Sequence, residues 1–215
     1  MHLYKSLIAV VILITSGFIL AAESDQEAIV YLQKHWAENN YQMSGKLQKE
    51  AFVALIEEAD KLVSQFPESA GVFIWRGIIE STYAGVKGGL SALKYAKAAK
   101  ADLEKALELD ANALDGSAYT SLGTLYFNVP GWPLGFGDDD KAEELLKKAL
   151  SINPDGLDPN YFYADYLRKE GQYKEAENYF KKALKAEPRP GREVADQGRR
   201  AEINAALIDI ARHLR

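Results

Sequence analysis

Residue types that could perform chemistry are few in this chain, and they are scattered. Cysteine is absent from the 215 residues, which excludes disulfides, thiolate metal sites and cysteine nucleophiles. After the first few residues, histidine occurs only as His35 and His213, near opposite ends of the sequence, so neither a histidine-centred triad nor a metal cluster is indicated. Carboxylate pairs such as Glu143 and Glu144 are adjacent on a predicted solvated helix face. We therefore expect a protein that is not an enzyme and that carries no cofactor and no metal.

An acidic run, residues 138–140, follows a glycine-rich segment and raises the question of a cation or nucleotide site. The run lacks the spacing of a calcium loop. It suits a helix start instead, where carboxylates accept free backbone N–H groups, and Asp140 with Glu143 is predicted to form a capping pair. Residues 135–137, Gly-Phe-Gly, complete neither of the glycine motifs that bind phosphate. Metal and nucleotide binding are therefore not expected.

Two aromatic residues in the same part of the chain are harder to explain. The stretch NVPGWPLGFGDDDKA, residues 128–142, contains two prolines and three glycines and interrupts an otherwise helical sequence. Trp132 and Phe136 lie in this stretch. Either the loop folds back and covers the end of a helix pair, or its aromatic side chains anchor an interface. Both alternatives stay open from the sequence.

The elements that position these residues form a repeat. Residues 160–188 are predicted to form a helix, a tight turn, a second helix and a terminating proline. A pattern of small residue, aromatic, small residue and proline marks the second helix and its end: Ala176, Phe180, Ala183 and Pro188. This pattern resembles the tetratricopeptide repeat.

Earlier segments repeat the pattern with variations. The second-helix positions are occupied by Ala142, Leu146 and Ala149 in one unit and by Ala99, Leu103 and Ala106 in the unit before it. Residues 46–66 are predicted to form a degenerate unit, and residues 192–214 a helix that caps the stack. We therefore predict an all-α fold, a tetratricopeptide-type α-solenoid of about four helix pairs plus a C-terminal capping helix, over residues 23–215.

Two of the predicted units are longer than the 34 residues that separate Pro154 from Pro188. The excess lies between the paired helices, around residues 83–95 in one unit and residues 127–140 in the next. Insertions at equivalent positions of stacked repeats emerge on the same edge of a solenoid. We therefore expect the two loops to be neighbours in space.

In tetratricopeptide proteins the first helix of each repeat lines a concave groove. The resemblance implies a groove of the same kind in this chain. The implied partner-binding residues are Ile74, Ile78, Thr120, Thr124, Phe127, Tyr161, Asp165 and Arg168, with Arg199 on the capping helix and Trp132 and Phe136 on the inserted loop. Such a groove is apolar at one end and charged at the other, which suits an extended peptide or a partner helix. The alternative is a closed pocket for a small hydrophobic ligand, lined by Ile74, Ile78, Phe127 and Trp132.

The first 22 residues form a separate segment. One lysine precedes an apolar run over residues 7–22, and acidic residues follow it, which is the layout of a signal peptide cleaved after Ala22. An uncleaved anchor in the inner membrane, with the domain facing the periplasm, is the alternative. No cysteine follows the run, so no lipid anchor is expected. The net charge of -5 and the pI near 5.4 provide no basic surface for nucleic acid.

A narrower resemblance covers about residues 75–167. The Gly-Gly insertion with its lysine-rich helix, and the Pro-Gly-Trp-Pro loop that leads into a glycine and acidic cluster, resemble the T-component of tripartite ATP-independent periplasmic (TRAP) transporters. Members of that family are exported tetratricopeptide proteins that associate with the transporter's solute-binding subunit. The resemblance therefore implies a periplasmic protein whose partner is such a subunit. The sequence does not predict an oligomeric state.

Overall fold

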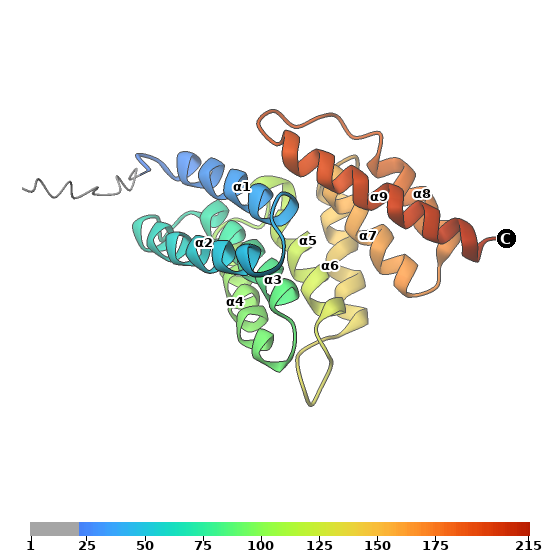
Figure 1. Cartoon of the computed structure of the whole chain (residues 1–215), viewed down its shortest axis with the longest axis horizontal. Coiled ribbons are helices and arrows are strands. Elements are labelled where there is room, and N and C mark those ends of the chain that lie inside the picture. The colour runs from blue at the N-terminus through green and yellow to red at the C-terminus, as the bar shows by residue number, and fades with distance from the viewer. Residues whose placement is uncertain (1–21) are drawn as a thin grey trace, which may run out of the picture.

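The computed structural model describes residues 22–215, and every regular element in that range is helical. The elements are α1 (Asp25–Tyr41), α2 (Gly45–Gln65), α3 (Ala70–Lys87), the 3-10 turn η1 (Leu90–Ala92), α4 (Leu93–Leu109), α5 (Ala113–Asn128), α6 (Asp139–Ile152), α7 (Leu157–Lys169), α8 (Tyr173–Ala183) and α9 (Glu193–His213). They follow one another across the molecule in chain order (Figure 1). The all-α solenoid is thus confirmed over this range, in which no helix is long and apolar enough to cross a membrane. The predicted signal peptide, residues 1–22, lies outside the described residues apart from Ala22.

Consecutive helices pair, and glycine allows two of the pairs to approach closely. Helix α3 packs on α4, α5 on α6, and α7 on α8. A Cβ atom added at Gly77 would lie 2.9 Å from Cγ of Leu103, and one added at Gly123 would lie 2.8 Å from Cγ of Leu146. These distances are too short for a carbon contact, so the first helix requires glycine where it crosses the leucine of the second.

We expect Gly123→Ala to lower the free energy of unfolding by about 1–3 kcal/mol, because the added methyl group overlaps Leu146 and forces α5 away from α6. Gly85→Ala is the matched control, since Gly85 also lies within a helix and an added Cβ there meets no atom within 4 Å. At that position alanine should be neutral or stabilising by up to about 1 kcal/mol. Urea denaturation followed by circular dichroism measures both. Equal effects at the two glycines would refute the packing argument.

The second-helix positions identified by the repeat pattern are all fully buried. They are Ala99, Leu103, Ala106, Ala142, Leu146, Ala149, Ala176, Phe180 and Ala183. Their spacing places them on one face of α4, α6 and α8, where all except Ala149 join the apolar clusters that form the core. The periodic pattern therefore predicted correctly which face of each second helix is buried.

Helix α6 starts earlier than predicted. Its N-cap is Asp138, whose side chain accepts a hydrogen bond from the backbone N–H of Lys141 at 3.0 Å. The predicted capping pair of Asp140 and Glu143 is therefore wrong. Because the helix begins two residues sooner, Asp140 lies in the first helical turn, where its charge complements the helix dipole.

The two predicted insertions lie at the same end of the molecule (Figure 1), and both contribute residues to the lining of one groove. The first insertion is shorter than predicted, because α3 continues to Lys87 and α4 begins at Leu93. Gly88 and Gly89 make the turn, with φ angles of 66° and 69°, which glycine adopts without strain. The second insertion is irregular between α5 and α6. Their position at one end of the molecule agrees with the expectation that the loops are neighbours.

The C-terminal helix does more than cap the last repeat. Helix α9 packs on α7 and α8 and also contacts α1, the first helix of the fold. Gly198 of α9 lies against Tyr41 of α1 so closely that an added Cβ would come within 2.3 Å of a ring carbon. The Tyr41 hydroxyl also donates to Glu202 at 3.5 Å. The first and last helices of the solenoid are therefore in direct contact.

Candidate functional site

A groove of about 1810 Å³ lies between the two halves of the solenoid. It is lined by α1, α3, η1, the start of α4, α5 and the start of α7, together with α8, α9 and the segment that joins them. Its large apolar side chains include Trp36, Trp75, Ile78, Leu114 and Phe162. Its basic side chains all come from the C-terminal part of the chain and are Lys181, Lys182, Lys185, Arg189, Arg192 and Arg199. The groove therefore offers an apolar and a cationic surface to the same occupant.

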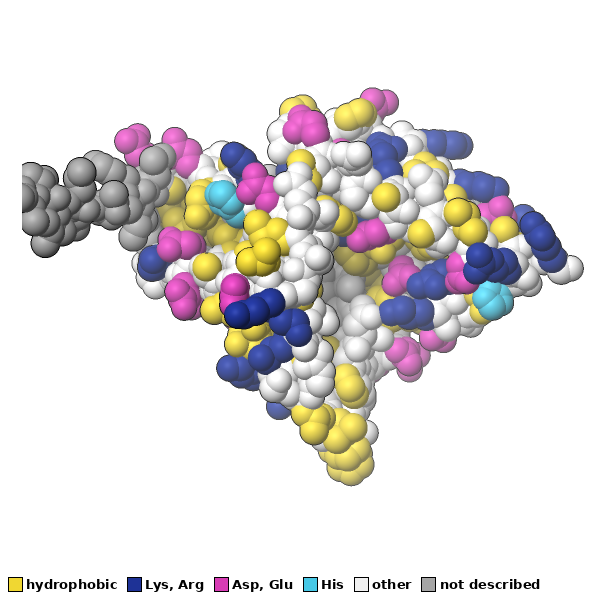
Figure 2. Space-filling model, viewed as in Figure 1, with side chains coloured by type: hydrophobic (Ala, Val, Ile, Leu, Met, Phe, Trp, Pro, Cys, Tyr) yellow, Lys and Arg dark blue, Asp and Glu magenta, His cyan; other side chains and the backbone are white. Residues whose placement is uncertain are grey.

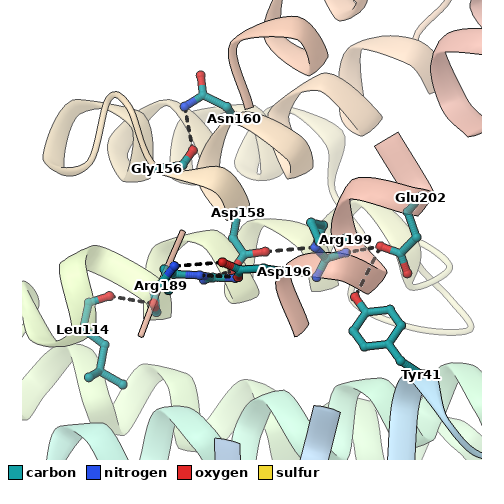
Figure 3. Close-up of polar contacts among 10 residues, drawn as sticks. Tyr41, Leu114, Gly156, Asp158, Asn160, Arg189, Asp196, Arg199 and Glu202 are labelled. Atoms are coloured by element: carbon teal, nitrogen blue, oxygen red, sulfur yellow. Dashed lines mark hydrogen bonds and ion pairs between the residues drawn. The ribbon is translucent and has the colours of Figure 1, made fainter. Parts of the chain in front are cut away.

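The charged part of the groove is organised around Asp158, in the first turn of α7 (Figure 3). Arg189 Nη1 donates to Asp158 Oδ2 at 2.6 Å, and Arg199 Nε donates to Asp158 Oδ1 at 2.9 Å. Each arginine has a second carboxylate: Arg189 Nε donates to Asp196 at 2.7 Å, and Arg199 Nη1 donates to Glu202 at 2.6 Å. One carboxylate thus ties the start of α7 to α9 and to the segment before it.

The charges of this network persist at neutral pH. Burial alone would raise the pKa of the Asp158 carboxyl, but the Arg199 and Arg189 guanidinium groups outweigh it and hold the pKa well below its usual range. Burial would lower the pKa of Arg199, and Asp158 reverses this and raises it. The Arg199 guanidinium carbon also lies 4.2 Å from the centroid of the Tyr161 ring. Within residues 22–215, no three His, Asp or Glu side chains gather in a way that could hold a metal ion.

Arg192 differs from its two neighbours because it has no ion-pair partner among the described residues, whereas Arg189 and Arg199 hold the adjacent carboxylates. Its guanidinium carbon lies 5.0 Å from the centroid of the Trp75 ring, in a cation–π arrangement. Its Nε and the Nε1 of Trp75 are buried without a hydrogen-bond partner in residues 22–215. Burial, and then the nearby Arg189, lower the pKa of Arg192. Asp158 and Asp196 act on Arg192 in the opposite sense without a direct ion pair. Arg192 is therefore a cation without a paired carboxylate where the apolar and basic linings meet.

Four of the predicted partner-binding residues line the groove: Ile78, Thr120, Thr124 and Arg199. The Thr124 hydroxyl donates to the backbone carbonyl of Thr120 at 2.8 Å. The Thr120 hydroxyl is buried and has no partner within residues 22–215. The structure thus brings predicted positions of α3, α5 and α9 to one surface.

Ile74 is a core residue rather than a groove residue. Its side chain is fully buried in the cluster where α3 packs against α4 and α5. Ile78, one turn further along α3, is only half-buried and reaches the groove. The repeat pattern assigned both residues to the groove because they share a helix face, but the neighbouring helices cover the first of them.

The predicted positions on α7 also lie away from the groove lining. Arg168 pairs with Asp165 on its own helix at 2.7 Å and with Asp209 of α9 at 3.3 Å. Tyr161 lies beneath Arg199 of α9, and burial raises the pKa of Tyr161 to about 12. Helix α9 packs across α7, so these side chains meet α9 instead of an open groove.

The closed pocket predicted for a small hydrophobic ligand is not assembled from its four residues. Ile78 alone lines the groove, and Ile74 is in the core. Phe127 packs on Tyr166, with 5.8 Å between ring centroids. Trp132 is 89% exposed. The four side chains therefore point to separate places and do not enclose a common cavity.

The two aromatic residues of the inserted loop are used differently. Phe136 turns back and packs edge-on against Tyr126, with 5.5 Å between ring centroids, and the Lys100 ammonium lies 5.9 Å from its ring. Phe136 thus covers the end of α5 and the side of α4, as expected if the loop folds back over a helix pair. Trp132 points away from the fold and is almost fully exposed.

Several groove residues were not predicted, namely Trp36, Trp75, Arg189 and Arg192. Trp36 belongs to α1, where the repeat pattern is too degenerate to assign positions. Arg189 lies between Pro188 and the predicted capping helix, and Arg192 is the first residue predicted for that helix, where only Arg199 was assigned to the groove. The sequence Pro-Arg-Pro-Gly-Arg, which contains both, was the available signal, since two prolines restrict the backbone that carries the charges.

Models of the tetratricopeptide repeat match residues 134–196 and residues 90–112. No curated protein sequence matches the chain. Among solved structures, a thermophilic tetratricopeptide protein of Thermus thermophilus is similar, with a TM-score of 0.60 and 20% identity over 86% of this chain and 82% of that one. MamA (TM-score 0.45, 19% identity, 78% and 91% covered) and pilF of Pseudomonas aeruginosa (0.36, 15%, 87% and 92%) also match. The chain therefore contains tetratricopeptide repeats in an α-solenoid, which typically serves as a non-catalytic scaffold for protein interactions.

Proposed function

We propose that this protein is a non-enzymatic scaffold that holds a segment of a protein partner in its groove. The observation that carries the proposal is Arg192, a guanidinium without an ion-pair partner among residues 22–215, held on Trp75 beside the apolar lining. A partner segment with a carboxylate next to apolar side chains would satisfy both surfaces. Binding of this kind requires shape and charge complementarity on a rigid scaffold and no chemical step.

We further propose that the partner is the solute-binding subunit of a TRAP transporter and that the protein is exported to the periplasm. The resemblance of the Pro-Gly-Trp-Pro loop and the Gly-Gly insertion to the T-component supports the choice of partner. The charge and hydropathy of residues 1–22 support export. Retention of that segment as an anchor in the inner membrane is the alternative localisation.

Arg192→Met is expected to weaken binding of a purified TRAP solute-binding protein by about tenfold to a hundredfold, because a charge-assisted hydrogen bond is lost. The methionine chain still packs on Trp75, so the melting temperature should change little. Arg212→Met is the matched control, since Arg212 is exposed in the last turn of α9 and does not line the groove. Isothermal titration calorimetry measures both affinities.

Two different outcomes would contradict the two proposals. If Arg192→Met and Arg212→Met bind as tightly as the unaltered protein, Arg192 is not a contact and the groove is not the binding surface. If the unaltered protein does not bind the solute-binding protein at all, the TRAP partner is rejected.

A further inference from the structure

The loop between α5 and α6 forms a stiff finger that projects from the solenoid (Figure 1). Its two arms are joined by backbone hydrogen bonds, from Gly137 N–H to the Pro130 carbonyl at 3.0 Å and from Gly135 N–H to the Gly131 carbonyl at 3.1 Å. A Cβ atom at Gly137 would lie 1.9 Å from the Val129 carbonyl oxygen. The arms are therefore as close as glycine permits, and the finger has a defined shape.

The tip of this finger is apolar and exposed. Trp132 is 89% exposed and Leu134 is 60% exposed, and Leu90 of the neighbouring insertion is 74% exposed. Hydrophobic side chains gather at this pointed end of the molecule (Figure 2). The other two tryptophans, Trp36 and Trp75, are buried. Trp132 is thus the one tryptophan that does not contribute to the core.

Basic side chains flank the apolar tip on the side of α4. Lys87 ends α3, and Lys94 and Lys97 lie in the first turns of α4, on either side of the Leu90 insertion. Lys and Arg side chains are massed above the tip over these helices (Figure 2). Residues 138–140, three aspartates, stand at the start of α6, where the helix N-terminus partly offsets their charge. The cationic side of the tip contrasts with the net charge of -5 of the chain.

A lipid surface suits this combination better than a protein surface does. A stable protein interface covers about 800 Å² on each partner, whereas the exposed tip consists of three large apolar side chains. A bilayer interface accepts a few apolar side chains from one protruding loop and favours tryptophan at the level of the headgroups. Anionic headgroups attract nearby lysines.

We propose that this end of the molecule inserts into an anionic lipid surface, with Trp132, Leu134 and Leu90 in the interface and the lysines of α3 and α4 on the headgroups. Trp132 and Leu134 do not line the groove, whereas Leu90 lies at its edge. Membrane contact can therefore be tested apart from partner binding through the two residues of the finger.

Trp132 itself reports the contact, because Trp36 and Trp75 are buried. When the full chain is mixed with vesicles of phosphatidylglycerol and phosphatidylcholine, we expect tryptophan emission to shift to shorter wavelength and to be quenched by brominated lipid. Trp132→Phe should abolish both changes. Residues 1–22 contain no tryptophan, so association through that segment does not produce this signal.

A second variant moves the reporter. Trp132→Phe combined with Leu47→Trp places tryptophan on α2, at a position that is 72% exposed, and should not be quenched on the same vesicles. Leu90→Ser with Leu134→Ser should reduce quenching of Trp132 at least about threefold. Lys94→Gln with Lys97→Gln should reduce it on anionic vesicles and not on pure phosphatidylcholine, where the signal is already weak.

Three results would overturn the proposal. The first is unchanged Trp132 emission on anionic vesicles. The second is equal quenching of the reporter on α2, which would indicate adsorption without insertion of the finger. The third is a shift of Trp132 emission that the solute-binding protein produces and vesicles do not, which would make the tip a protein contact.

Discussion

Replacing Asp158 with alanine is expected to lower the free energy of unfolding by about 3–5 kcal/mol. The change leaves Arg189 and Arg199 without the carboxylate that they share, and Arg199 is almost fully buried. Each arginine keeps its second carboxylate, but a buried charge that loses one of its two partners costs more than an exposed one, because water cannot replace the lost interaction. Urea denaturation at neutral pH measures the loss.

Asp155→Ala is the matched control for this change. Asp155 lies in the preceding loop, is exposed, and pairs with Lys182 at 3.3 Å, so its removal should cost less than about 1 kcal/mol. A loss at Asp158 no larger than the loss at Asp155 would contradict the expected role of the network. Because the pKa of Asp158 is lower in the folded than in the unfolded protein, its contribution is present above about pH 4 and is lost as the pH falls through the folded value.

Replacing Glu80 with glutamine is expected to raise the free energy of unfolding at alkaline pH, whereas the replacement of Asp158 lowers it. Glu80 is buried on α3, and its Oε2 has no hydrogen-bond partner within residues 22–215. Burial, and then the nearby Asp102 carboxylate, raise the pKa of Glu80 to about 8, against the opposing effect of Arg76. Arg76 donates two hydrogen bonds of 2.6 Å to Asp102 and none to Glu80. Glu80 therefore remains protonated in the folded protein at neutral pH.

The pH window follows from the two states of Glu80. The unfolded chain ionises this carboxyl near pH 4.5, whereas the folded protein keeps the proton up to about pH 8. Stability therefore falls as the pH rises across this window and is level above it. The advantage of Glu80→Gln should be near zero at about pH 4 and at most about 5 kcal/mol at about pH 9. Glu50→Gln, at an exposed carboxylate of α2, should show no such trend, and an equal advantage of Glu80→Gln at both pH values would disprove the ionisation argument.

The helix pairs could be predicted from the sequence because each pair depends on contacts between elements that are adjacent in the chain. Gly123 must be small for α5 to approach Leu146 of α6, and Gly77 has the same relation to Leu103. A requirement that recurs in each unit leaves a periodic pattern. Both the fold class and the buried faces of the second helices follow from that pattern.

The groove could be predicted only in part, because its lining depends on how the whole stack curves. Ile78 and Thr124 lie on α3 and α5, where the repeat geometry holds, and both reach the groove. The assignment of Arg168 did not hold because α9 crosses α7. The contact of Gly198 with Tyr41 joins residues from opposite ends of the chain, and no local pattern specifies such a contact.

That contact between α9 and α1 has a consequence for how the solenoid opens. A linear array of repeats frays from both ends, because each terminal unit has a single neighbour to lose. Here the terminal helices are neighbours of each other, so the array is a ring and neither end is free. Opening one terminal unit removes a partner from the other, and the two must open together. We therefore expect a chain assembled from local units to unfold as one cooperative body.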